Sequence, residues 1–586
     1  METINYAGSA PTADAIALEI EKERRRRYAE AGLDLDKRKH FKRPGERPFT
    51  KAERDTTTIL YGGLTLRHER LIHAAFTSLG YRMSVIPTPR KADFQAGKEY
   101  GNNGQCNPTY FTVGALVNYL KDLRDRQGIA TEAILRDYIF VTAGSCGPCR
   151  FGMYEAEYRL ALRNSGFDGF RVILFQQQGG LKQAVGEEQG LEFNAAFALR
   201  LLNAIVMGDL LNEVAYQLRP YEAEPGQVNR AFDRALDHIC DAFQTANDRI
   251  GAAPAWWKRL PKSLREKDGL RILQQRWEPF YVQTMAEACR IIAENVEVDF
   301  TRPRPVCKVT GEFWAQTTEG DGNFHMFEFL EAQGAEVLVE TITTWINYLI
   351  NQARGKIADQ AGLEDPKGPF GALRGRLRNR WKLARIEIAR RFLDREYERL
   401  RKALGGTAHR QVCQLELQRM GHPYYNSKAA GGEGHLEVAK NIYYANKSLA
   451  HMVMSLKPFG CMPSAQSDGA QAAVTTHFSD MIFIPIETSG EGDVNAHSRA
   501  QMALGEAKLK SKQEFQACVK RSGYTIDQIR AYVEAHPDFR KPFQKLPHYE
   551  GVVGRAANFV LYVGERMAED RAWKVDREGA ATRAVV

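Results

Sequence analysis

Three loops of this 586-residue chain place a cysteine just before a segment of helical pattern. The loops are GNNGQCNPTY with Cys106, AGSCGPCR with Cys146 and Cys149, and KPFGCMPSAQSD with Cys461. A helix N-terminus presents unpaired N–H groups and the positive end of the macrodipole, an environment that stabilises thiolate. Thiolate is the form of cysteine that holds metals and iron–sulfur clusters. If the three loops converge, they predict a cluster site built from distant parts of one chain.

The same cysteines allow two other chemistries. Cys146 and Cys149 form a CGPC sequence, which has the spacing of a thioredoxin-like dithiol. That motif is expected near the start of a small domain, without companion cysteine loops. Zinc also accepts three or four thiolates, but its ligands usually come as two close pairs, and this chain has one such pair. Spacing therefore favours an iron–sulfur site and leaves the dithiol and zinc interpretations open.

The other five cysteines lie in segments of helical or strand pattern, where packing is their expected role. They are Cys240, Cys289, Cys307, Cys413 and Cys518. Residues 1–28 lack the apolar segment and small-residue cleavage site of a secretory signal. We therefore expect a reducing, cytoplasmic setting, in which nine cysteines do not form a disulfide framework.

Polar residues beside the cysteines could tune a cluster. These residues are Asn102, Asn103, Gln105, Arg150, Ser464, Gln466 and Ser467. An arginine beside an anionic cluster would stabilise its reduced state by Coulomb attraction. Serines at these positions could equally cap the helices that follow, as Ser145 or Ser464 would.

Two further polar clusters follow segments with strand pattern. Glu312 and His325 lie in or next to GEFWAQTTEGDGN (311–323), at the edge where open α/β sheets bind ligands, and could contact substrate or a partner. The second cluster could supply a general acid or base and consists of Glu487, Glu491, Asp493 and His497. The sequence identifies no catalytic residue beyond these candidates. GGEGH (431–435) lacks a phosphate-binding context, and we expect a flexible loop there.

Strand–helix–strand patterns predict how these loops are positioned. An apolar strand at 57–65, an amphipathic helix at 68–80 and a strand at 81–87 predict a parallel βαβ unit. The theme returns with strands at 138–142 and 170–175, and again with strands at 305–311, 336–340 and 480–486. The fold class is therefore α/β, with two lobes of parallel sheet and substantial helical segments.

The expected organisation has five parts. They are a basic helical lead-in (1–55), a first lobe with the Cys106 and CGPC loops (56–190), a helical segment (191–300), a second lobe with the Cys461 loop (301–520) and a C-terminal helical extension (521–586). The second lobe carries a largely helical insertion at about 341–456.

The composition and charge of the chain limit the kinds of partner that we expect. We find no run of 18 apolar residues, so no membrane-spanning helix is expected. The net charge of +9 comes largely from the segments at 23–47 and 374–401. The second segment mixes arginine with acids at helical spacing, which suits a solvated helix or a protein-docking face. No nucleic-acid-binding module accompanies the charge, so nucleic acid is not an expected partner.

Several phrases resemble a known family. They are GNNGQCNPTYFTVGALVNYL, TAGSCGPCRFGMYEAEYRLAL, FQQQGG, KPFGCMPSAQSDG and IETSGEGDVNAHSRAQM. They are similar to the dehydratase-like portion of acyl-CoA dehydratase activase-related proteins, which is related to 2-hydroxyacyl-CoA dehydratases, benzoyl-CoA reductases and double-cubane cluster proteins. The resemblance covers residues 57–507 and is specific in its cysteine loops.

The resemblance implies two Rossmann-like lobes with a cluster between them, held by Cys106, Cys146 and Cys149 and by Cys461 from the second lobe. It also implies that a separate ATP-hydrolysing activase supplies low-potential electrons. This chain would use them for a difficult reduction or a radical dehydration, of an acyl-CoA-type substrate by analogy. The phosphate loops of the activase are absent from this chain, and no GxxxxGK[ST] sequence occurs.

Four cysteines exceed the three per subunit of the dehydratases, so both a [4Fe–4S] and a double-cubane cluster stay open. A homodimer that shares clusters at its interface would suit the double cubane. Two alternative functions also stay open. One is an electron relay or maturation component without a substrate of its own, and the other is an iron-free thiol oxidoreductase based on CGPC.

Overall fold

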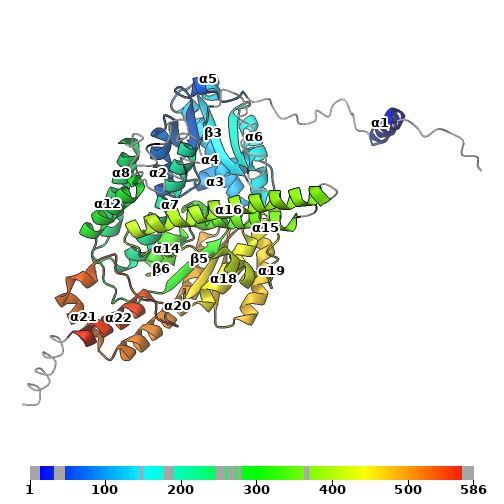
Figure 1. Ribbon diagram of the computed structural model, residues 1–586. Helices are drawn as coiled ribbons and strands as arrows, with labels where there is room; N and C mark the ends of the chain where they lie inside the picture. The colour runs from blue at the N-terminus through cyan, green and yellow to red at the C-terminus, as the bar shows by residue number, and fades with distance from the viewer. Residues whose placement is uncertain are drawn as a thin grey trace, which may run out of the picture. The chain divides into compact units, whose positions relative to one another are not determined.

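The structure is a computed structural model (Figure 1). It describes residues 13–31, 47–144, 149–176, 190–245, 259, 272, 279–361, 363, 369–429 and 431–570. Residues 1–47 and 48–586 form two separate compact units. In the first unit, α1 (Ala13–Glu30) carries arginine–glutamate pairs one turn apart, such as Arg26 with Glu23 at 2.7 Å. All remaining elements belong to the second unit.

The first sheet is parallel throughout and has the strand order β2-β1-β3-β4. Its strands are β1 (Thr58–Tyr61), β2 (Arg82–Val85), β3 (Tyr138–Gly144) and β4 (Arg171–Gln176). After β2 the chain returns to the other side of β1 to form β3. The strand order therefore reverses between β1 and β3, and ligands of open α/β sheets bind at the carboxyl ends of such strands.

The second sheet repeats this topology with the order β6-β5-β7-β8, again all parallel. Its strands are β5 (Val306–Gly311), β6 (Glu336–Leu338), β7 (Met452–Pro458) and β8 (Ile482–Thr488). The reversal lies between β5 and β7. The predicted α/β class with two lobes of parallel sheet is confirmed, whereas the expected domain boundaries stay predictions.

One central strand escaped the sequence analysis. β7 begins at Met452, inside the stretch of 341–456 that its pattern indicated as largely helical. Every residue of β7 is buried, because helices cover both faces of the sheet. A strand buried on both faces loses the apolar–polar alternation that identifies strands, so its pattern matches that of a buried helix.

Helices cover both faces of the first sheet. They are α2 (Leu66–Thr77), α3 (Lys91–Tyr100), α4 (Asn107–Asp125), α5 (Thr131–Asp137) and α6 (Tyr154–Asn164). Ile59 packs with α2 on one face, and its neighbour Leu60 packs with α4 on the other. Successive residues of a strand point to opposite faces, so both faces of β1 are buried.

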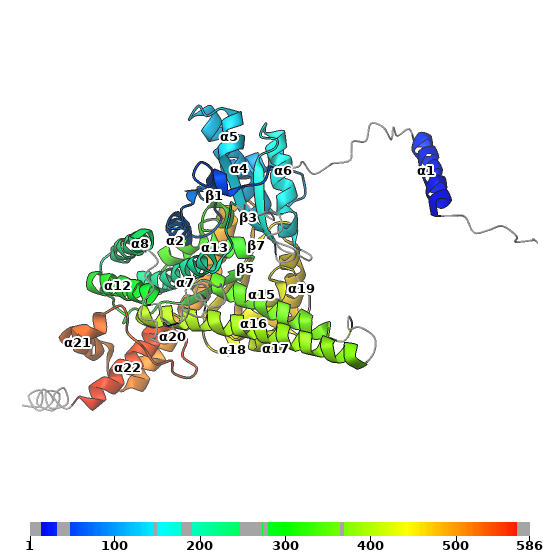
Figure 2. The same cartoon turned by 45° about the horizontal axis from the view of Figure 1, so that its top comes forward.

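The largest hydrophobic core surrounds α7 (Ala195–Leu218), which packs against α2, α15 (Ile342–Asp359) and α16 (Pro369–Ala403). Together with the turn to Tyr221, α7 is long and apolar enough to cross a membrane, but 56% of the apolar 18-residue window within it is buried inside the molecule. Such burial is typical of the core helix of a soluble protein. Figure 2 shows α7 between the first lobe and the pair α15 and α16.

The remaining helices surround α7 and the second sheet. They are α8 (Gln227–Thr245), α12 (Phe280–Asn295), α13 (Phe313–Thr317), α14 (Met326–Ala332), α17 (Gln414–Gly421), α18 (Gly434–Asn446), α19 (Met462–His477), α20 (Asp493–Ser522), α21 (Ile526–Ala535) and α22 (Arg555–Glu569). Short 3-10 turns occur at Lys51–Glu53, Arg150–Met153, Arg219–Tyr221, Asp321–Asn323 and Pro537–Arg540.

Candidate functional site

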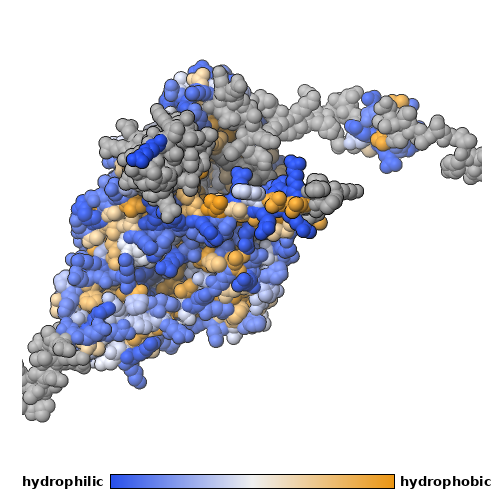
Figure 3. Space-filling model, in the orientation of Figure 1, coloured by the Kyte–Doolittle hydropathy of each residue, from blue (hydrophilic) through white to orange (hydrophobic). Residues whose placement is uncertain are grey.

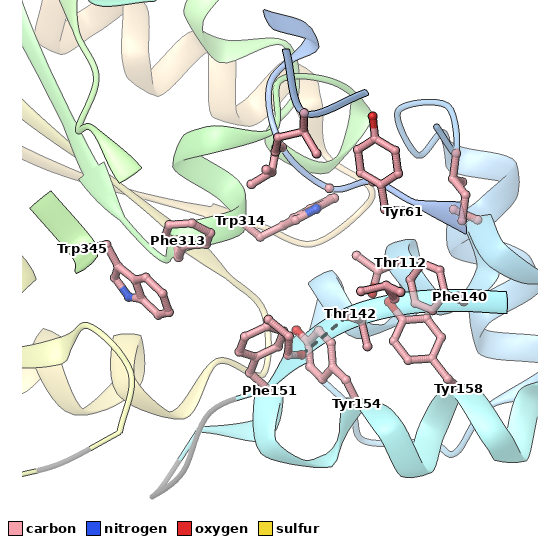
Figure 4. Close-up of a pocket in the computed structure, with 18 of the residues that line it drawn as sticks. Tyr61, Thr112, Phe140, Thr142, Phe151, Tyr154, Tyr158, Phe313, Trp314 and Trp345 are labelled. Atoms are coloured by element: carbon pink, nitrogen blue, oxygen red, sulfur yellow. Dashed lines mark hydrogen bonds between the residues drawn. The ribbon is translucent and has the colours of Figure 1, made fainter. Parts of the chain in front are cut away.

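A cavity of about 450 Å³ lies where the carboxyl ends of the two sheets face each other (Figure 4). Gly62 and Gly63 follow β1 at its wall, Thr142 and Ala143 belong to the end of β3, and Glu312 follows β5 directly. The reversal points of both lobes therefore open on one space. Its volume lies in the range of small-molecule sites in proteins.

Aromatic rings make up much of the cavity wall. Figure 4 shows Phe313, Trp314 and Trp345 on the side of the second lobe and Phe151, Tyr154 and Tyr158 on the side of the first. Among the described lining residues there is no lysine, arginine or histidine. The wall therefore suits an apolar group and offers no cation to an anionic one.

Cys106 is buried, with 5% of its surface exposed, and is the residue directly before α4. Its Sγ lies 3.1 Å from the Thr109 hydroxyl and 3.3 Å from the Tyr154 hydroxyl. Because Tyr154 also lines the cavity, one phenol connects this thiol to the cavity wall. Pro108 lies near the start of α4, where backbone N–H groups have no acceptor within the helix. The N–H that proline lacks therefore costs no hydrogen bond at this position.

Cys461 occupies the same position before α19, with 8% of its surface exposed. Its loop lies directly against that of Cys106: the Asn107 amide donates to the carbonyl of Phe459 at 3.0 Å. The Asn107 side chain donates to the carbonyl of Thr488 at 2.7 Å. The first and second lobes are therefore joined at their cysteine loops.

The third cysteine loop, which carries Cys149, contacts the Cys461 loop through Arg150. Cys149 is half-buried, precedes the 3-10 turn that leads into α6, and lines the cavity. Arg150 donates from Nε to the carbonyl of Gly460 at 3.0 Å. Cys146 lies outside the described residues. The structure thus brings the loops of Cys106, Cys149 and Cys461 into contact, which is the condition that the sequence analysis set for a shared site.

Burial opposes the thiolate form of Cys106 and Cys461. Burial, with the nearby Glu312 carboxylate, raises the pKa of the Cys106 thiol despite hydrogen bonds that favour the thiolate. The pKa of Cys461 is raised for the same two reasons, burial first. Desolvation disfavours the thiolate at both positions, and a nearby positive charge, such as that of a bound metal, would favour it.

Two buried carboxyls border the cavity. Glu312 caps α13, accepting from the Ala315 amide at 3.0 Å, and Glu433 accepts from the Trp345 indole N–H at 3.0 Å. Burial raises the pKa of both carboxyls, and their mutual repulsion adds to the effect at Glu433. Glu312 keeps some accessible surface because it faces the cavity. Both carboxyls are suited to donate protons inside an apolar site.

A buried ion pair lies beneath the Cys461 loop. Lys457 Nζ is 2.9 Å from Glu437, whose other oxygen accepts from the Ser467 hydroxyl at 2.8 Å. Lys457 also contacts Ser467 at 3.1 Å. This network fixes the strand end at Lys457 to the second turn of α19, and so fixes the loop between them.

Several residues flanking the cysteines have structural contacts. Asn102 and Gln105 both donate to Glu157, at 2.7 and 3.1 Å, which fixes the loop to α6. Gln466 accepts from the Tyr425 hydroxyl at 2.8 Å. Ser464 lies beside Cys461 and favours its thiolate by hydrogen bonding. Asn103 is exposed.

The other candidates lie away from the cavity. Of the described residues that line it, none is Glu487, Glu491 or His497. Both carboxylates are exposed, and His497 stacks on Phe329 with its Nε2 2.7 Å from the carbonyl of Phe324. Asp493 begins α20, and His325 pairs with Asp321 at 3.1 Å on the surface.

Sequence reasoning missed Glu433 and Trp345. Glu433 lies in GGEGH, for which the sequence analysis expected a flexible loop, yet 8% of its surface is exposed and it precedes α18. A Cβ on Gly432 would stand 2.3 Å from Pro463 and 3.7 Å from the Cβ of Cys149, so the glycines permit close packing against two cysteine loops. A charged residue between glycines, directly before an apolar helix, was the available signal.

The residues present fit an iron–sulfur cluster by their donor chemistry, since cysteine-bearing loops from both lobes contact one another beside a cavity that Cys149 lines. No group of three or more His, Cys, Asp or Glu side chains among the described residues could hold a single metal ion. Ligands of a four-iron cluster bind separate irons and need not meet at one point. No protein-family model matches the chain, and no curated protein matches it either.

Proposed function

We propose that this protein is an iron–sulfur protein that accepts low-potential electrons from an ATP-hydrolysing activase and uses them for a difficult reduction or radical dehydration. Cys106, Cys146, Cys149 and Cys461 would hold a [4Fe–4S] or double-cubane cluster. One observation carries the proposal: the loops of Cys106, Cys149 and Cys461, from two lobes, contact one another at the edge of an apolar cavity.

The cluster would supply electrons one at a time at low potential. The chain's own residues contribute the surroundings. Arg150 is held by the Gly460 carbonyl between two cysteine loops, and its positive charge favours electron uptake by an anionic site. The hydroxyls of Tyr154 and Thr109 lie within hydrogen-bond distance of the Cys106 sulfur, and both would donate to it as a thiolate, which would stabilise its negative charge.

Glu312 and Glu433 would supply protons to a substrate that receives electrons in the cavity. Their raised pKa values keep protons available near neutral pH, beside a largely apolar wall. The apolar end of an acyl-CoA-type substrate suits the aromatic wall. The phosphates of a coenzyme A group would stay outside, because no cation occurs among the described residues of the wall.

We place this function in the cytoplasm, with the activase as the electron donor. A homodimer would be the oligomeric state that shares a double-cubane cluster at its interface. A relay or maturation component without a substrate is a weaker candidate, because the cavity beside the loops has room for a small molecule. A CGPC thiol oxidoreductase is favoured by one feature, the half-buried position of Cys149.

The test is anaerobic purification, iron and sulfide analysis, and EPR spectroscopy of the dithionite-reduced protein. Cys106→Ser and Cys461→Ser should each lose most of the iron and the EPR signal. Cys518→Ser is the matched control, because Cys518 has the same 5% exposure as Cys106 and lies in α20, and it should keep both. About four irons per chain would indicate one cubane.

Three outcomes would decide against the proposal. Iron-free protein after anaerobic reconstitution would contradict it, and a reducible Cys146–Cys149 disulfide in that protein would favour the thiol oxidoreductase. Iron retained in both variants would place the cluster on other ligands. A bound cluster that is reduced but transfers no electrons to any added acyl-CoA-type compound would favour the relay.

A further inference from the structure

The outer half of α16 carries an apolar stripe that no part of the described chain covers. Its residues are Leu373, Leu377, Trp381, Ala384 and Ile388, all exposed, with 70% of the Trp381 surface accessible. At 100° per residue these positions fall within about 80° of the helix circumference, and the row is about 22 Å long. Large apolar side chains in one exposed row, not scattered singly, mark an interaction surface.

The inner face of α16 is already occupied. Gly375 is buried and Leu383 half-buried on the side that packs against α15, and further along Leu393 and Tyr397 enter the main core. Figures 1 and 2 both show α15 and α16 side by side, and Figure 3 shows apolar side chains along the outer part of α16 between hydrophilic ones. The helix therefore has apolar residues on two opposite faces, and only one of these faces packs against the rest of the described chain.

The spacing of the stripe specifies the shape of its partner. Leu377, Trp381, Ala384 and Ile388 follow one another at intervals of four, three and four residues. This is the a/d spacing of one strand of a coiled coil, which packs against a facing helix. The stripe is narrow, because arginines border it on both sides, so it fits a helix or a groove of similar width.

The charges specify the partner's chemistry. In this heptad register the flanking e and g positions are Arg378, Arg380, Arg385 and Glu387. Residues 374–385 contain six cations and no acid. Within the described part of the chain, no carboxylate forms an ion pair with Arg380 or Arg385. Because e and g charges set partner choice in coiled coils, this seam favours acidic flanks on the facing helix.

The same charges disfavour a second copy of this chain. Two such seams facing each other would bring arginine against arginine at the flanking positions, which is destabilising. We propose that the outer face of α16, from Leu373 to Ile388, is the docking surface for an acidic amphipathic helix of a partner protein. This surface is independent of the cluster and would exist if the iron–sulfur proposal failed.

The probe is a synthetic helical peptide with leucine at a and d positions and glutamate at e and g. The matched control peptide has lysine at e and g. Fluorescence anisotropy of the labelled peptides, added to the full protein, should show at least tenfold tighter binding of the acidic peptide. Its affinity should fall with rising salt, because the flanking charges contribute.

Variants assign the binding to the stripe. Trp381→Glu and Leu377→Glu should each weaken binding of the acidic peptide at least tenfold. Leu509→Glu is the control, because Leu509 lies on α20 and its exposed fraction of 56% falls between those of Leu377 (49%) and Trp381 (70%). The pair Arg380→Glu with Arg385→Glu should reverse the preference toward the lysine peptide. All five positions are exposed, so circular dichroism should show unchanged folding.

Binding of a different kind of partner to this surface would contradict the proposal, and each kind would give a different experimental result. Binding to phosphatidylglycerol vesicles through Trp381, without binding of the acidic peptide, would indicate a membrane surface. Self-association in sedimentation velocity that Leu377→Glu abolishes would indicate a second copy. Equal binding of both peptides, or binding unchanged in Trp381→Glu, would show that the stripe does not select an acidic helix.

Discussion

Gly460 lies directly against Cys106. A Cβ added at position 460 would stand 3.1 Å from the Cα of Cys106 and 3.0 Å from the carbonyl oxygen of Gln105. Gly460 also has a φ of +78°, in the left-handed region. Glycine is therefore favoured at position 460 for two reasons: the left-handed backbone conformation and the close contact between the two cysteine loops.

Gly460→Ala should destabilise the protein by more than its backbone strain alone. The matched control is Gly523→Ala, because Gly523 has the same φ of +78° and no atom within 4 Å of an added Cβ. The control should cost about 1 kcal/mol, and Gly460→Ala about 1–2 kcal/mol more, since the Cys106 loop must move. Urea-induced unfolding followed by tryptophan fluorescence measures both. Equal losses in the two variants would show that the loops have room to separate.

The sequence predicted the cysteine loops but not which of them touch. Each loop was recognisable because glycine or proline stands beside a cysteine before a helical pattern. Contacts such as Asn107 with Phe459 depend on how two lobes pack, which no local spacing records. The strands of the first lobe were predictable because short apolar runs alternate with amphipathic helices. β7 was not, since burial on both faces removes its periodicity.

The acid–base candidates failed to reach the cavity for a similar reason. Glu487 lies near the end of β8, the edge strand, and Glu491 follows it, whereas the cavity lies at the ends of the central strands β1, β3 and β5. Glu312 was placed well by the sequence because it directly follows β5. Glu433 could not be placed, because its loop reaches the cavity only through packing against Pro463.

Glu340 holds two buried lysines in the second lobe, so Glu340→Gln should destabilise the protein strongly. Its carboxylate lies 3.1 Å from Lys308 and 2.9 Å from Lys440, and both lysines are almost fully buried. Removing the shared anion leaves two buried cations, at a cost of about 3–5 kcal/mol in the free energy of unfolding. Chemical denaturation at pH 7 measures the loss, and Glu569→Gln, at an exposed pair, should change nothing.

The effect of Glu340→Gln should depend on pH in one direction. The two lysines lower the pKa of Glu340 to about 2, although burial opposes them. A carboxyl with a lowered pKa in the folded state contributes stability above its unfolded pKa of about 4.5 and loses it as the pH falls. The difference between wild type and variant should narrow from about pH 4.5 downward. A constant difference would show that the carboxylate charge is not what holds the lysines.

Glu69 should make the protein less stable as the pH rises. Its Oε1 accepts from the amides of Gly63 and Leu64 at 3.0 and 3.2 Å, which fixes the turn after β1 at the cavity wall. Burial raises the pKa of Glu69 to about 7, despite these hydrogen bonds. The folded state therefore binds more protons than the unfolded state between about pH 4.5 and 7, and stability falls across that window by about 3 kcal/mol.

Glu69→Gln isolates this contribution, because its amide oxygen can accept the same two hydrogen bonds without titrating. Thermal unfolding should give similar midpoints for the variant and wild type near pH 4.5. Near pH 8 the variant should unfold at a higher temperature. Parallel curves for the two proteins would mean that Glu69 titrates alike in the folded and unfolded states.

The cavity should distinguish a neutral ring from an anionic one. Benzamide and benzoate have nearly the same shape, but benzoate would place a charge beside Glu312 and Glu433 in a wall whose described residues include no cation. An unpaired buried charge is costly, so benzamide should bind at least tenfold more tightly at pH 8. Isothermal titration calorimetry measures both affinities.

Filling the cavity locates this binding. Leu349 lies on α15 and lines the cavity, so Leu349→Trp should abolish benzamide binding. Leu509→Trp, at an exposed position on α20, should leave it unchanged. If benzoate binds as tightly as benzamide, the cavity tolerates a negative charge, and the phosphates of a coenzyme A group could then enter with the acyl end. The comparison therefore decides which part of such a substrate the cavity admits.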